Sequence, residues 1–365
     1  MSPRIAVVGA GIAGASVAFA LARRGAAVTI IDDGSPGQAT AASAGIIAPW
    51  VSTATGPFYD LYAAGGAYYP VLLEQLAEAG ITRTDYRRTG SLIVNRDAAL
   101  LHAAEERVRA RVEVAGSVAG EVQRLTNAEA RQLFPALAED VEAVLLTGGG
   151  RVDGRTLRDA LLTAAGTLGA QRITSDAQLV KDGARTAVRV EDGLLDADAV
   201  VVAAGAWSAQ LLEAAHAPVP VAPQRGQITH LRLEGADTSA WPTIAPLSHH
   251  YIVAFDGGRV AVGATRETGS GFDPRVTAAG QLQVLQDALG IAPGLAEATV
   301  LETRVGLRPL ADHGLPVVGT LPGHADVWVA SGYGPAGLTM GPLLGDILAR
   351  GVLGEDVPEL APLAP

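Results

Sequence analysis

The sequence predicts an α/β fold in which a parallel sheet is combined with a separate antiparallel layer. Two units of strand, glycine turn and helix, one near each end of the chain, predict the parallel sheet. Between residues 223 and 273, apolar or alternating runs separated by turn residues predict the antiparallel layer. With 365 residues, the chain is long enough for about two domains and a large buried core.

The composition narrows the class of protein. The chain carries 27 basic and 38 acidic residues, a net charge of −11, which argues against a surface that neutralises nucleic-acid phosphates. Its 48% hydrophobic and 18% charged residues are typical of a compact globular protein and not of a disordered one. The lack of cysteine excludes disulfides, thiolate nucleophiles, iron–sulfur ligation and cysteinyl attachment of a cofactor.

The first element is an uncharged stretch at residues 5–22, flanked by arginines, which resembles a short membrane span or a signal peptide. Its glycines favour another interpretation. Residues 5–8 have the pattern of a buried strand, and residues 15–24 have that of a helix. We therefore expect a strand, a glycine turn and a helix, in a protein without a transmembrane segment.

A second strand pattern at residues 28–31 ends in Asp32 and completes a βαβ unit with the spacing G-x-G-x-x-G followed by an acid. Gly9 permits a tight turn, Gly11 lets a pyrophosphate approach the backbone, and Gly14 allows helix and strand to pack closely. The helix N-terminus offers N–H groups to phosphates, and Asp32 can accept hydrogen bonds from an adenosine ribose. The unit predicts a dinucleotide site, and an ordinary glycine turn is the alternative.

The same glycine spacing recurs at residues 332–337, between a strand pattern at 327–330 and an apolar helix pattern at 338–349. No strand with a terminal acid follows, so we do not expect a second adenosine site here. The start of this helix can instead stabilise negative charge on another part of a long cofactor. The two units together suggest one extended ligand.

Hydrophobic periodicity predicts the elements between these units. Helices are expected at residues 57–80, where glycines and a proline disturb the pattern, and at 98–114 and 155–168. Strands are expected at residues 91–94, 171–174, 186–190, 199–202, 227–233, 251–255 and 259–264. The strand at 199–202 stops on small residues, which leaves room for a flat group or only permits tight packing.

Three further side chains are candidates for chemistry. Arg308 lies in an apolar segment flanked by glycines, where it suits either a bidentate clamp on a carboxylate or a structural ion pair. His249 and His250 precede a predicted strand and could lie at a pocket mouth, although hairpin histidines more often face solvent. The histidines have no metal-site spacing, so no metal is expected.

Several segments carry a family resemblance. Besides the N-terminal unit, they are residues 38–45, 225–227, 263–265, 306–309 and 331–334. Together, and in this order, they resemble the FAD-dependent D-amino acid oxidase (DAO) family, especially glycine oxidases and D-amino acid dehydrogenases. The matching segments extend from residue 4 to about residue 350.

The resemblance implies a Rossmann-like FAD/NAD(P)-binding domain with an interposed α+β substrate domain built on an antiparallel sheet. The FAD domain is expected to be discontinuous and to comprise residues 1–82, 146–222 and 303–365. The substrate domain is expected to comprise residues 83–145 and 223–302. Noncovalent FAD is expected to lie across the βαβ unit, with its flavin ring at the domain interface.

The resemblance also implies a set of cofactor-binding residues. They are Gly9, Gly11, Gly14 and Asp32 at the adenosine and pyrophosphate, Thr40, Ser43, Ala44 and Gly45 beside the pyrophosphate and flavin, and Gly334, Ala336, Gly337, Leu338 and Thr339 near the flavin pyrimidine. Ala204 and Gly205 are added to this set because they follow the strand at 199–202 that stops on small residues. Among the expected catalytic residues, Arg308 matches the carboxylate-binding arginine and Tyr251 a tyrosine that faces substrate. The third, Tyr333, replaces a histidine that is frequent in the family, which leaves the pocket and the electron acceptor open.

The implied activity is oxidation of the CH–NH bond of glycine or a D-amino acid by hydride transfer to flavin N5. The resulting imine would hydrolyse to a 2-oxo acid and ammonia. N-methyl or cyclic amino acids, such as sarcosine or proline derivatives, are the alternative substrates, and a nucleotide-binding module without redox chemistry is a remote third possibility.

Oxygen and a quinone are both possible electron acceptors. The one lysine, Lys181, lies in a predicted hairpin and is a poor candidate for the flavin-facing lysine of sarcosine oxidase-like relatives, which slightly favours a dehydrogenase. A cytoplasmic protein is expected, peripheral at the inner membrane if it reduces a quinone.

Overall fold

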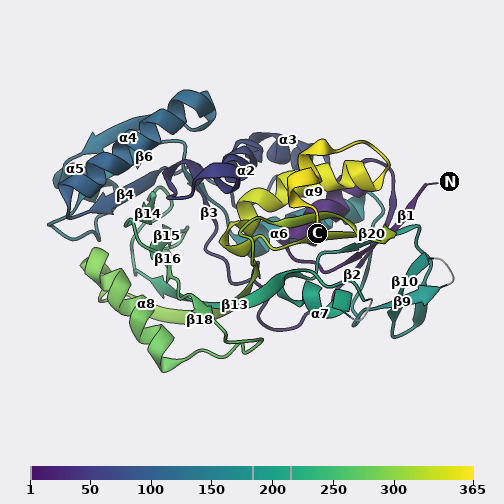
Figure 1. Cartoon of the computed structure of the whole chain (residues 1–365). Coiled ribbons are helices and arrows are strands. Elements are labelled where there is room, and N and C mark those ends of the chain that lie inside the picture. Colours follow the sequence, from purple (N-terminus) through teal and green to yellow (C-terminus); the bar gives the residue numbers. More distant parts are fainter. Residues whose placement is uncertain (1, 183–184, 214–215) are drawn as a thin grey trace.

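Two large β-sheets organise the structure, a computed structural model that describes residues 2–182, 185–213 and 216–365. One sheet is six-stranded and mostly parallel, and the other is nine-stranded and mostly antiparallel. The two sheets lie at opposite ends of the molecule in Figure 1, with the chain termini beside the six-stranded sheet. The predicted α/β class with an antiparallel layer is confirmed.

The six-stranded sheet contains the strands of both glycine-turn units. Its strands, in spatial order, are β19 (Val317–Leu321), β20 (His324–Ser331), β12 (Ala199–Val202), β1 (Arg4–Val8), β2 (Ala27–Ile31) and β8 (Gln171–Ile173). All neighbours pair in parallel except β19 with β20. Since β12, β1 and β20 are adjacent, the ends of these three strands bring both glycine turns to one edge of the sheet.

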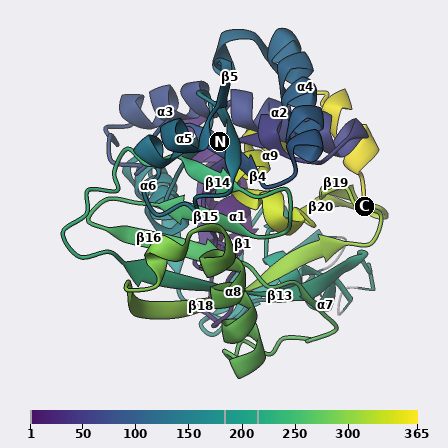
Figure 2. The same cartoon turned by 90° about the vertical axis from the view of Figure 1, so that its left-hand side faces the viewer.

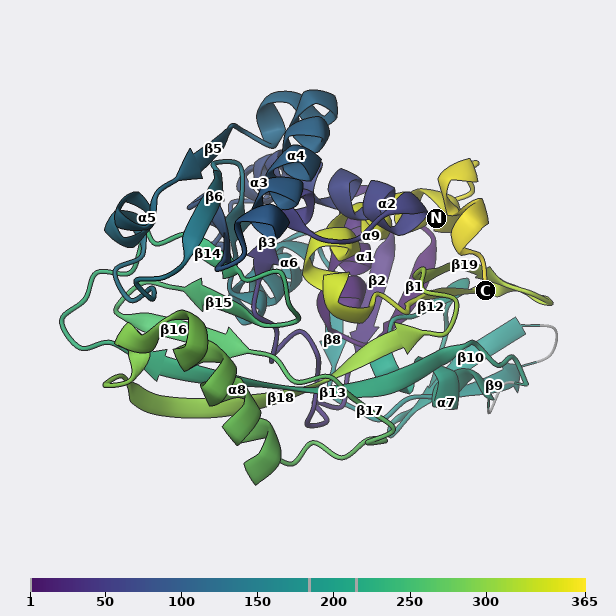
Figure 3. The same ribbon diagram turned by 60° about the vertical axis from the view of Figure 1, so that its left-hand side comes forward.

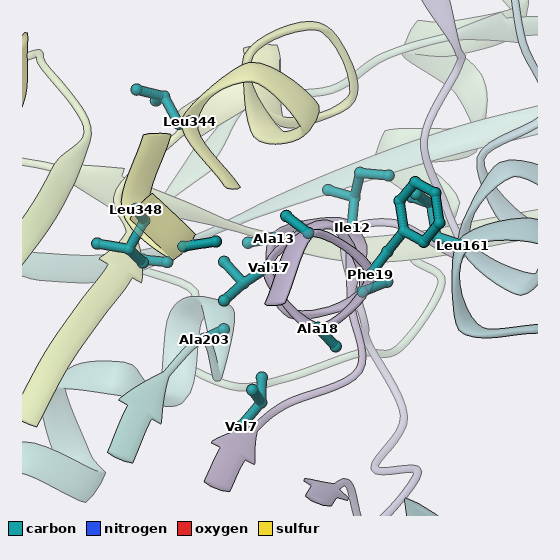
Figure 4. Close-up of a cluster of buried hydrophobic side chains, with 14 of the residues drawn as sticks. Val7, Ile12, Ala13, Val17, Ala18, Phe19, Leu161, Ala203, Leu344 and Leu348 are labelled. Atoms are coloured by element: carbon teal, nitrogen blue, oxygen red, sulfur yellow. The ribbon is translucent and has the colours of Figure 1, made fainter. Parts of the chain in front are cut away.

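Three helices pack around this sheet: α1 (Ile12–Arg23), α6 (Gly154–Thr167) and α9 (Gly337–Val352). Figure 4 shows α1 between the other two, with Val17 beside Leu348 of α9 and Phe19 beside Leu161 of α6. Burial on almost every side explains why this helix contains no charge before its last turn. In the described part of the chain, no helix is both long and apolar enough to cross a membrane.

The nine-stranded sheet forms the second layer. Its strands are β17 (Glu267–Thr268), β13 (Val221–Arg232), β16 (Arg259–Gly263), β15 (Tyr251–Ala254), β14 (Thr243–Ala245), β4 (Ser91–Asn95), β6 (Glu142–Leu146) and β5 (Val122–Leu125), with β18 (Thr299–Ala311) paired along β13. Helices α4 (Ala98–Ala115), α5 (Asn127–Leu133) and α8 (Ala278–Ile291) cover it. Figure 2 shows α4 and α8 on opposite sides of this sheet, and Figure 3 shows β13 and β18 extending toward the six-stranded sheet.

Shorter elements complete the described structure. They are β3 (Ile46–Ile47), β7 (Gly150–Arg151), β9 (Gln178–Asp182), β10 (Arg185–Val190), β11 (Gly193–Leu195) and α7 (Ser208–Glu213). The hairpin predicted around Lys181 is confirmed by the antiparallel pairing of β9 with β10, and residues 183–184 lie outside the described residues.

One predicted helix and two predicted domain boundaries differ from the structure. The helix expected at 57–80 is two helices, α2 (Gly56–Ala67) and α3 (Tyr69–Glu78), because Pro70 lacks an N–H and is favoured in the first turn of a new helix. The expected domain boundaries at residues 222 and 303 fall inside β13 and β18, which continue across both. The division into two domains stays a prediction.

Candidate functional site

A cleft of about 950 Å³ lies between the two sheets. The glycine turn after β1, the loop at 38–48, the end of β12 and the start of α9 line it on the side of the six-stranded sheet. Tyr251, Arg266 and Arg308 line it on the side of the nine-stranded sheet. Every predicted cofactor and catalytic residue except Gly14 therefore borders this one cleft.

The glycine turn leaves no room for side chains on its inner side. Gly9 has φ +104°, and a Cβ there would lie 2.3 Å from the carbonyl oxygen of Ala203 at the end of β12. A Cβ on Gly14 would lie 1.9 Å from the carbonyl oxygen of Gly9, so this glycine allows α1 to pack on the turn. Gly11 is different, because the nearest atom to its Cβ position is Oγ1 of Thr40 at 3.4 Å. Gly11 thus presents bare backbone to the cleft.

Polar groups around the first turn of α1 are held in place by hydrogen bonds. Oγ1 of Thr40 accepts a hydrogen bond from the Ile12 N–H at 2.9 Å. The carboxylate of Asp32, at the end of β2, accepts from the Ala10 N–H at 2.6 Å and from Nε2 of Gln38 at 3.0 Å. The carboxylate is therefore fixed beside the turn, at the position the fingerprint predicts for a ribose partner.

The loop beside this turn is packed against α6. Oγ of Ser43 donates a hydrogen bond to the Thr40 carbonyl at 2.8 Å, and a Cβ on Gly154 would lie 2.3 Å from that Oγ. Gly45 has φ +79°, and a Cβ there would lie 1.7 Å from the carbonyl oxygen of Val152. Only glycine fits at 45 and 154. The sequence analysis singled out Gly45 through the family resemblance alone and did not single out Gly154.

The start of α9 is fixed from behind by α2 and α3. The Tyr69 hydroxyl donates a hydrogen bond to the Leu338 carbonyl at 2.7 Å, and a Cβ on Gly65 would lie 2.5 Å from the Thr339 carbonyl oxygen. The backbone N–H groups of the first turn are directed toward the cleft end of the helix, where the macrodipole is positive. This end is suited to a group that gains negative charge.

Tyr333 precedes α9 and is 3% exposed. Its hydroxyl has no hydrogen-bond partner among the described residues, and burial raises the pKa of this group far above its usual value. The phenol is therefore neutral and available as a donor to a group in the cleft.

Arg308 is half-buried at the cleft wall formed by β18. Its Nη1 donates a hydrogen bond to the Thr265 carbonyl at 3.0 Å, and the guanidinium lies against Gly226, where a Cβ would be 2.4 Å from both Nη atoms. Within the described residues, no carboxylate lies within the 4.0 Å ion-pair distance of this guanidinium. Of the two interpretations left open by the sequence, the structure favours the one that leaves the charge for a ligand.

A second arginine, Arg266, lines the same cleft and was missed by sequence reasoning. It too has no carboxylate within ion-pair distance among the described residues. Partial burial and the positive charge of Arg308 lower the pKa of Arg266. It directly follows the 263–265 segment that carried part of the family resemblance, so its position was a usable signal.

The residues before β15 were only partly predicted. Tyr251 borders the cleft, and burial raises the pKa of its phenol while the nearby Arg308 opposes that shift. The expectation that both histidines face solvent is wrong for His250, which is 7% exposed. The loop between β14 and β15 lines the cleft, and burial there lowers the pKa of His250 to about 4. His249 is exposed.

These features define a class of protein: an α/β protein with a glycine-lined cleft suited to an extended dinucleotide at the edge of its parallel sheet, next to two arginines. The lining suits a ligand that lies directly against the backbone. Gly9, Gly11 and Gly45 leave this part of the cleft free of side chains, and a Cβ at any of them would narrow or distort it. The orphaned hydroxyl of Tyr333 adds a donor at the far end.

The family model for FAD-dependent oxidoreductases (DAO) matches residues 4–350, and the chain belongs to this family. The protein is thus an FAD-binding oxidoreductase, which confirms the resemblance and the cofactor expected from the sequence.

Known proteins similar to this chain cover almost its whole length. The uncharacterized oxidoreductase YurR of Bacillus subtilis (strain 168) is 45% identical over 363 residues, 98% of this chain and 97% of the relative. The glycine oxidase of Geobacillus kaustophilus is 30% identical over 356 residues, 94% of this chain and 91% of the relative. The crystal structure of iminodiacetate oxidase from Chelativorans sp. BNC1 superimposes with a TM-score of 0.96 at 46% identity, covering 99% of each chain.

Proposed function

We propose that this protein oxidises the CH–NH bond of a small amino acid whose carboxylate is bound by Arg308. The observation that carries the proposal is the cleft-facing guanidinium of Arg308, which has one backbone acceptor and no ion-pair partner among the described residues. A planar guanidinium with free N–H groups is suited to bidentate binding of a carboxylate. Glycine or a D-amino acid is the first substrate class, as the relationship to glycine oxidases supports.

In this proposal, backbone groups hold most of the bound FAD, and Asp32 is the charged side chain among its contacts. Gly9, Gly11 and the start of α1 would contact the pyrophosphate, Asp32 the ribose, and Thr40, Ser43, Ala44 and Gly45 the adjoining part of the cofactor. Ala204 and Gly205 border the same path, and Gly334, Ala336, Gly337, Leu338 and Thr339 would contact the flavin pyrimidine. The chemistry that FAD supplies is acceptance of a hydride from the substrate carbon.

The residues of this chain would then act by orientation. Arg308 fixes the carboxylate, and Tyr251 restricts the substrate from the same wall. The start of α9 stabilises negative charge at the pyrimidine end, next to the neutral phenol of Tyr333. Loss of a hydride and a proton leaves the substrate as an imine, which water hydrolyses to a 2-oxo acid and ammonia.

Arg266 favours a second candidate substrate, a secondary amine with a carboxylate on each arm. Two guanidinium groups that repel each other in one cleft are stabilised when a ligand brings two negative charges. The similarity to iminodiacetate oxidase supports this candidate. Such a secondary amine belongs to the N-substituted class that includes N-methyl and cyclic amino acids. Hydrolysis of its imine would give a 2-oxo acid and a primary amino acid.

The test is an anaerobic titration of the FAD-loaded protein with glycine, D-alanine, sarcosine, D-proline and iminodiacetate, followed by flavin absorbance. Bleaching by glycine or D-alanine, with ammonia released, supports the first candidate, and faster bleaching by iminodiacetate, with glycine released, supports the second. Retention of oxidised flavin with all five compounds would refute the proposal. Recovery of the absorbance in air identifies oxygen as acceptor, whereas recovery only with a quinone analogue identifies a dehydrogenase.

Two arginine variants separate the candidates. Arg308→Ala should lower kcat/KM at least about 100-fold for every substrate, because it removes the shared carboxylate contact. Arg266→Ala should lower kcat/KM for iminodiacetate about 10- to 100-fold and leave glycine within about threefold. Arg109→Ala is the matched control, since Arg109 is exposed and pairs with Glu105 in α4, outside the cleft lining. Separately from these tests, we propose that the protein is cytoplasmic.

A further inference from the structure

The segment that carries Arg266 is held by a hydrogen-bond network centred on the carboxylate of Glu267. Oε2 of Glu267 accepts hydrogen bonds from Nε and Nη2 of Arg225 at 2.9 and 2.6 Å. Oε1 accepts from Nε2 of Gln227 at 2.7 Å and from Oγ1 of Thr265 at 2.6 Å. Each oxygen of this carboxylate therefore has two donors, and its capacity to accept is filled.

Thr265 connects this network to Arg308. Its Oγ1 accepts a hydrogen bond from the Gln227 N–H at 2.9 Å, and its carbonyl oxygen accepts from Nη1 of Arg308 at 3.0 Å. Thr265 is 1% and Gln227 0% exposed, so the two residues are part of the sheet interior. Arg225, Gln227, Thr265 and Glu267 are all absent from the cleft lining. The carbonyl that orients Arg308 is thus fixed by groups that do not contact the substrate.

The network also keeps the negative charge of Glu267 away from the two arginines of the cleft. Glu267 is the carboxylate next to Arg266 in the chain, and an unpaired carboxylate there would compete with substrate for the guanidinium groups. Partial burial acts to raise the pKa of Glu267, but hydrogen bonds from Thr265, Arg225 and Gln227 lower it overall. The carboxylate stays charged and engaged with Arg225. Arg266 and Arg308 are left without a competing partner in the described part of the chain.

We propose that Glu267 is the positioning residue for both substrate-binding arginines. Its four hydrogen bonds fix residues 265–267, which directs the Thr265 carbonyl to Arg308 and sets the backbone of Arg266. The inference rests on the proposed function, because Glu267 positions substrate-binding groups only if Arg266 and Arg308 bind carboxylates of the substrate.

The test uses the FAD-loaded Glu267→Gln variant and two unreactive probes, acetate and malonate, titrated against the flavin absorbance. Loss of the charged contact with Arg225 should raise Kd for acetate roughly tenfold and for malonate more, because malonate can engage both arginines. KM for the preferred substrate should rise similarly, with kcat within about threefold and FAD affinity unchanged. Glu302→Gln is the matched control, since Glu302 pairs with Arg304 on β18 and is not part of the cleft lining.

A milder variant covers the case in which Glu267→Gln does not fold. Thr265→Val keeps the shape of the side chain and removes the hydroxyl between Glu267 and the Gln227 N–H, so Kd for acetate should rise about threefold. Unchanged probe binding in whichever variant folds overturns the inference, as does an equal effect in Glu302→Gln. If the unmodified protein itself binds neither probe, the proposed function is refuted and the inference with it.

Discussion

Substitution of Gly226 by alanine tests whether the position of Arg308 controls catalysis. The new Cβ would lie 2.4 Å from both Nη atoms, and ordinary contact begins at 3.4 Å, so the guanidinium must move by about 1 Å. Arg308 can move because its guanidinium is the end of a flexible side chain, and the fold should therefore be little affected. A misplacement of about 1 Å in a substrate-binding group typically costs on the order of 100-fold in rate.

We therefore expect Gly226→Ala to lower kcat/KM roughly 100-fold, with an unchanged FAD spectrum and less than about 1 kcal/mol lost in urea unfolding. Steady-state kinetics measures kcat/KM, and titration of the flavin absorbance with acetate measures how well the displaced Arg308 still binds a carboxylate. Gly290→Ala is the control, because a Cβ at Gly290 in α8 meets nothing within 4 Å. A folded Gly226→Ala protein with kcat/KM within twofold of the unmodified protein would show that Arg308 does not bind the substrate.

Three other substitutions test the remaining parts of the site. Gly9→Ala should destabilise the protein by about 3 kcal/mol or more in urea unfolding, because the new Cβ would be 2.3 Å from the rigid Ala203 carbonyl at φ +104°; a smaller loss contradicts the rigid turn. Tyr69→Phe removes the hydrogen bond to Leu338, so the free energy of unfolding should fall by about 1–2 kcal/mol and FAD should bind more weakly in a fluorescence titration. Unchanged FAD affinity would show that this bond does not support the cofactor site. Folding lowers the pKa of His250 from 6.5 to about 4, so the unfolded chain binds the proton more readily and stability falls as pH drops from 6.5 to 4. His250→Gln should remove up to roughly 3 kcal/mol of this fall, and an unchanged pH dependence in urea unfolding would contradict the buried neutral imidazole.

The sequence was most informative where a local pattern imposes a local conformation. The turn at Gly9 and Gly11 and the acid at Asp32 follow from spacing within one βαβ unit, and the structure places all three at the cleft. Arg308 was identified from its apolar, glycine-flanked surroundings, but its lack of an ion pair depends on residues far away in the chain. Local pattern could not decide between its two interpretations.

The features that sequence reasoning missed depend on strand pairing. Arg225 meets Glu267 because β13 pairs with β17, at a separation of 42 residues along the chain. No periodicity within either segment indicates this pairing, so the position of Arg266 after the 263–265 segment was its one signal in the sequence. The burial of His250 was also not visible, since the loop before β15 borders the cleft and its local sequence does not indicate this neighbour.

The two walls of the cleft present different groups, backbone on one and charged side chains on the other. This difference would allow the substrate to change while the cofactor is kept. The wall on the six-stranded sheet presents backbone at positions such as Gly9 and Gly45, where any side chain would collide with another part of the main chain. The opposite wall presents the side chains of Arg266 and Arg308, which have no carboxylate partner in the described part of the chain, while Glu267 is bonded to other donors. A substitution on the first wall disturbs folding, whereas one on the second changes which anion fits. Substrate choice can therefore vary at Arg266 without loss of the FAD site.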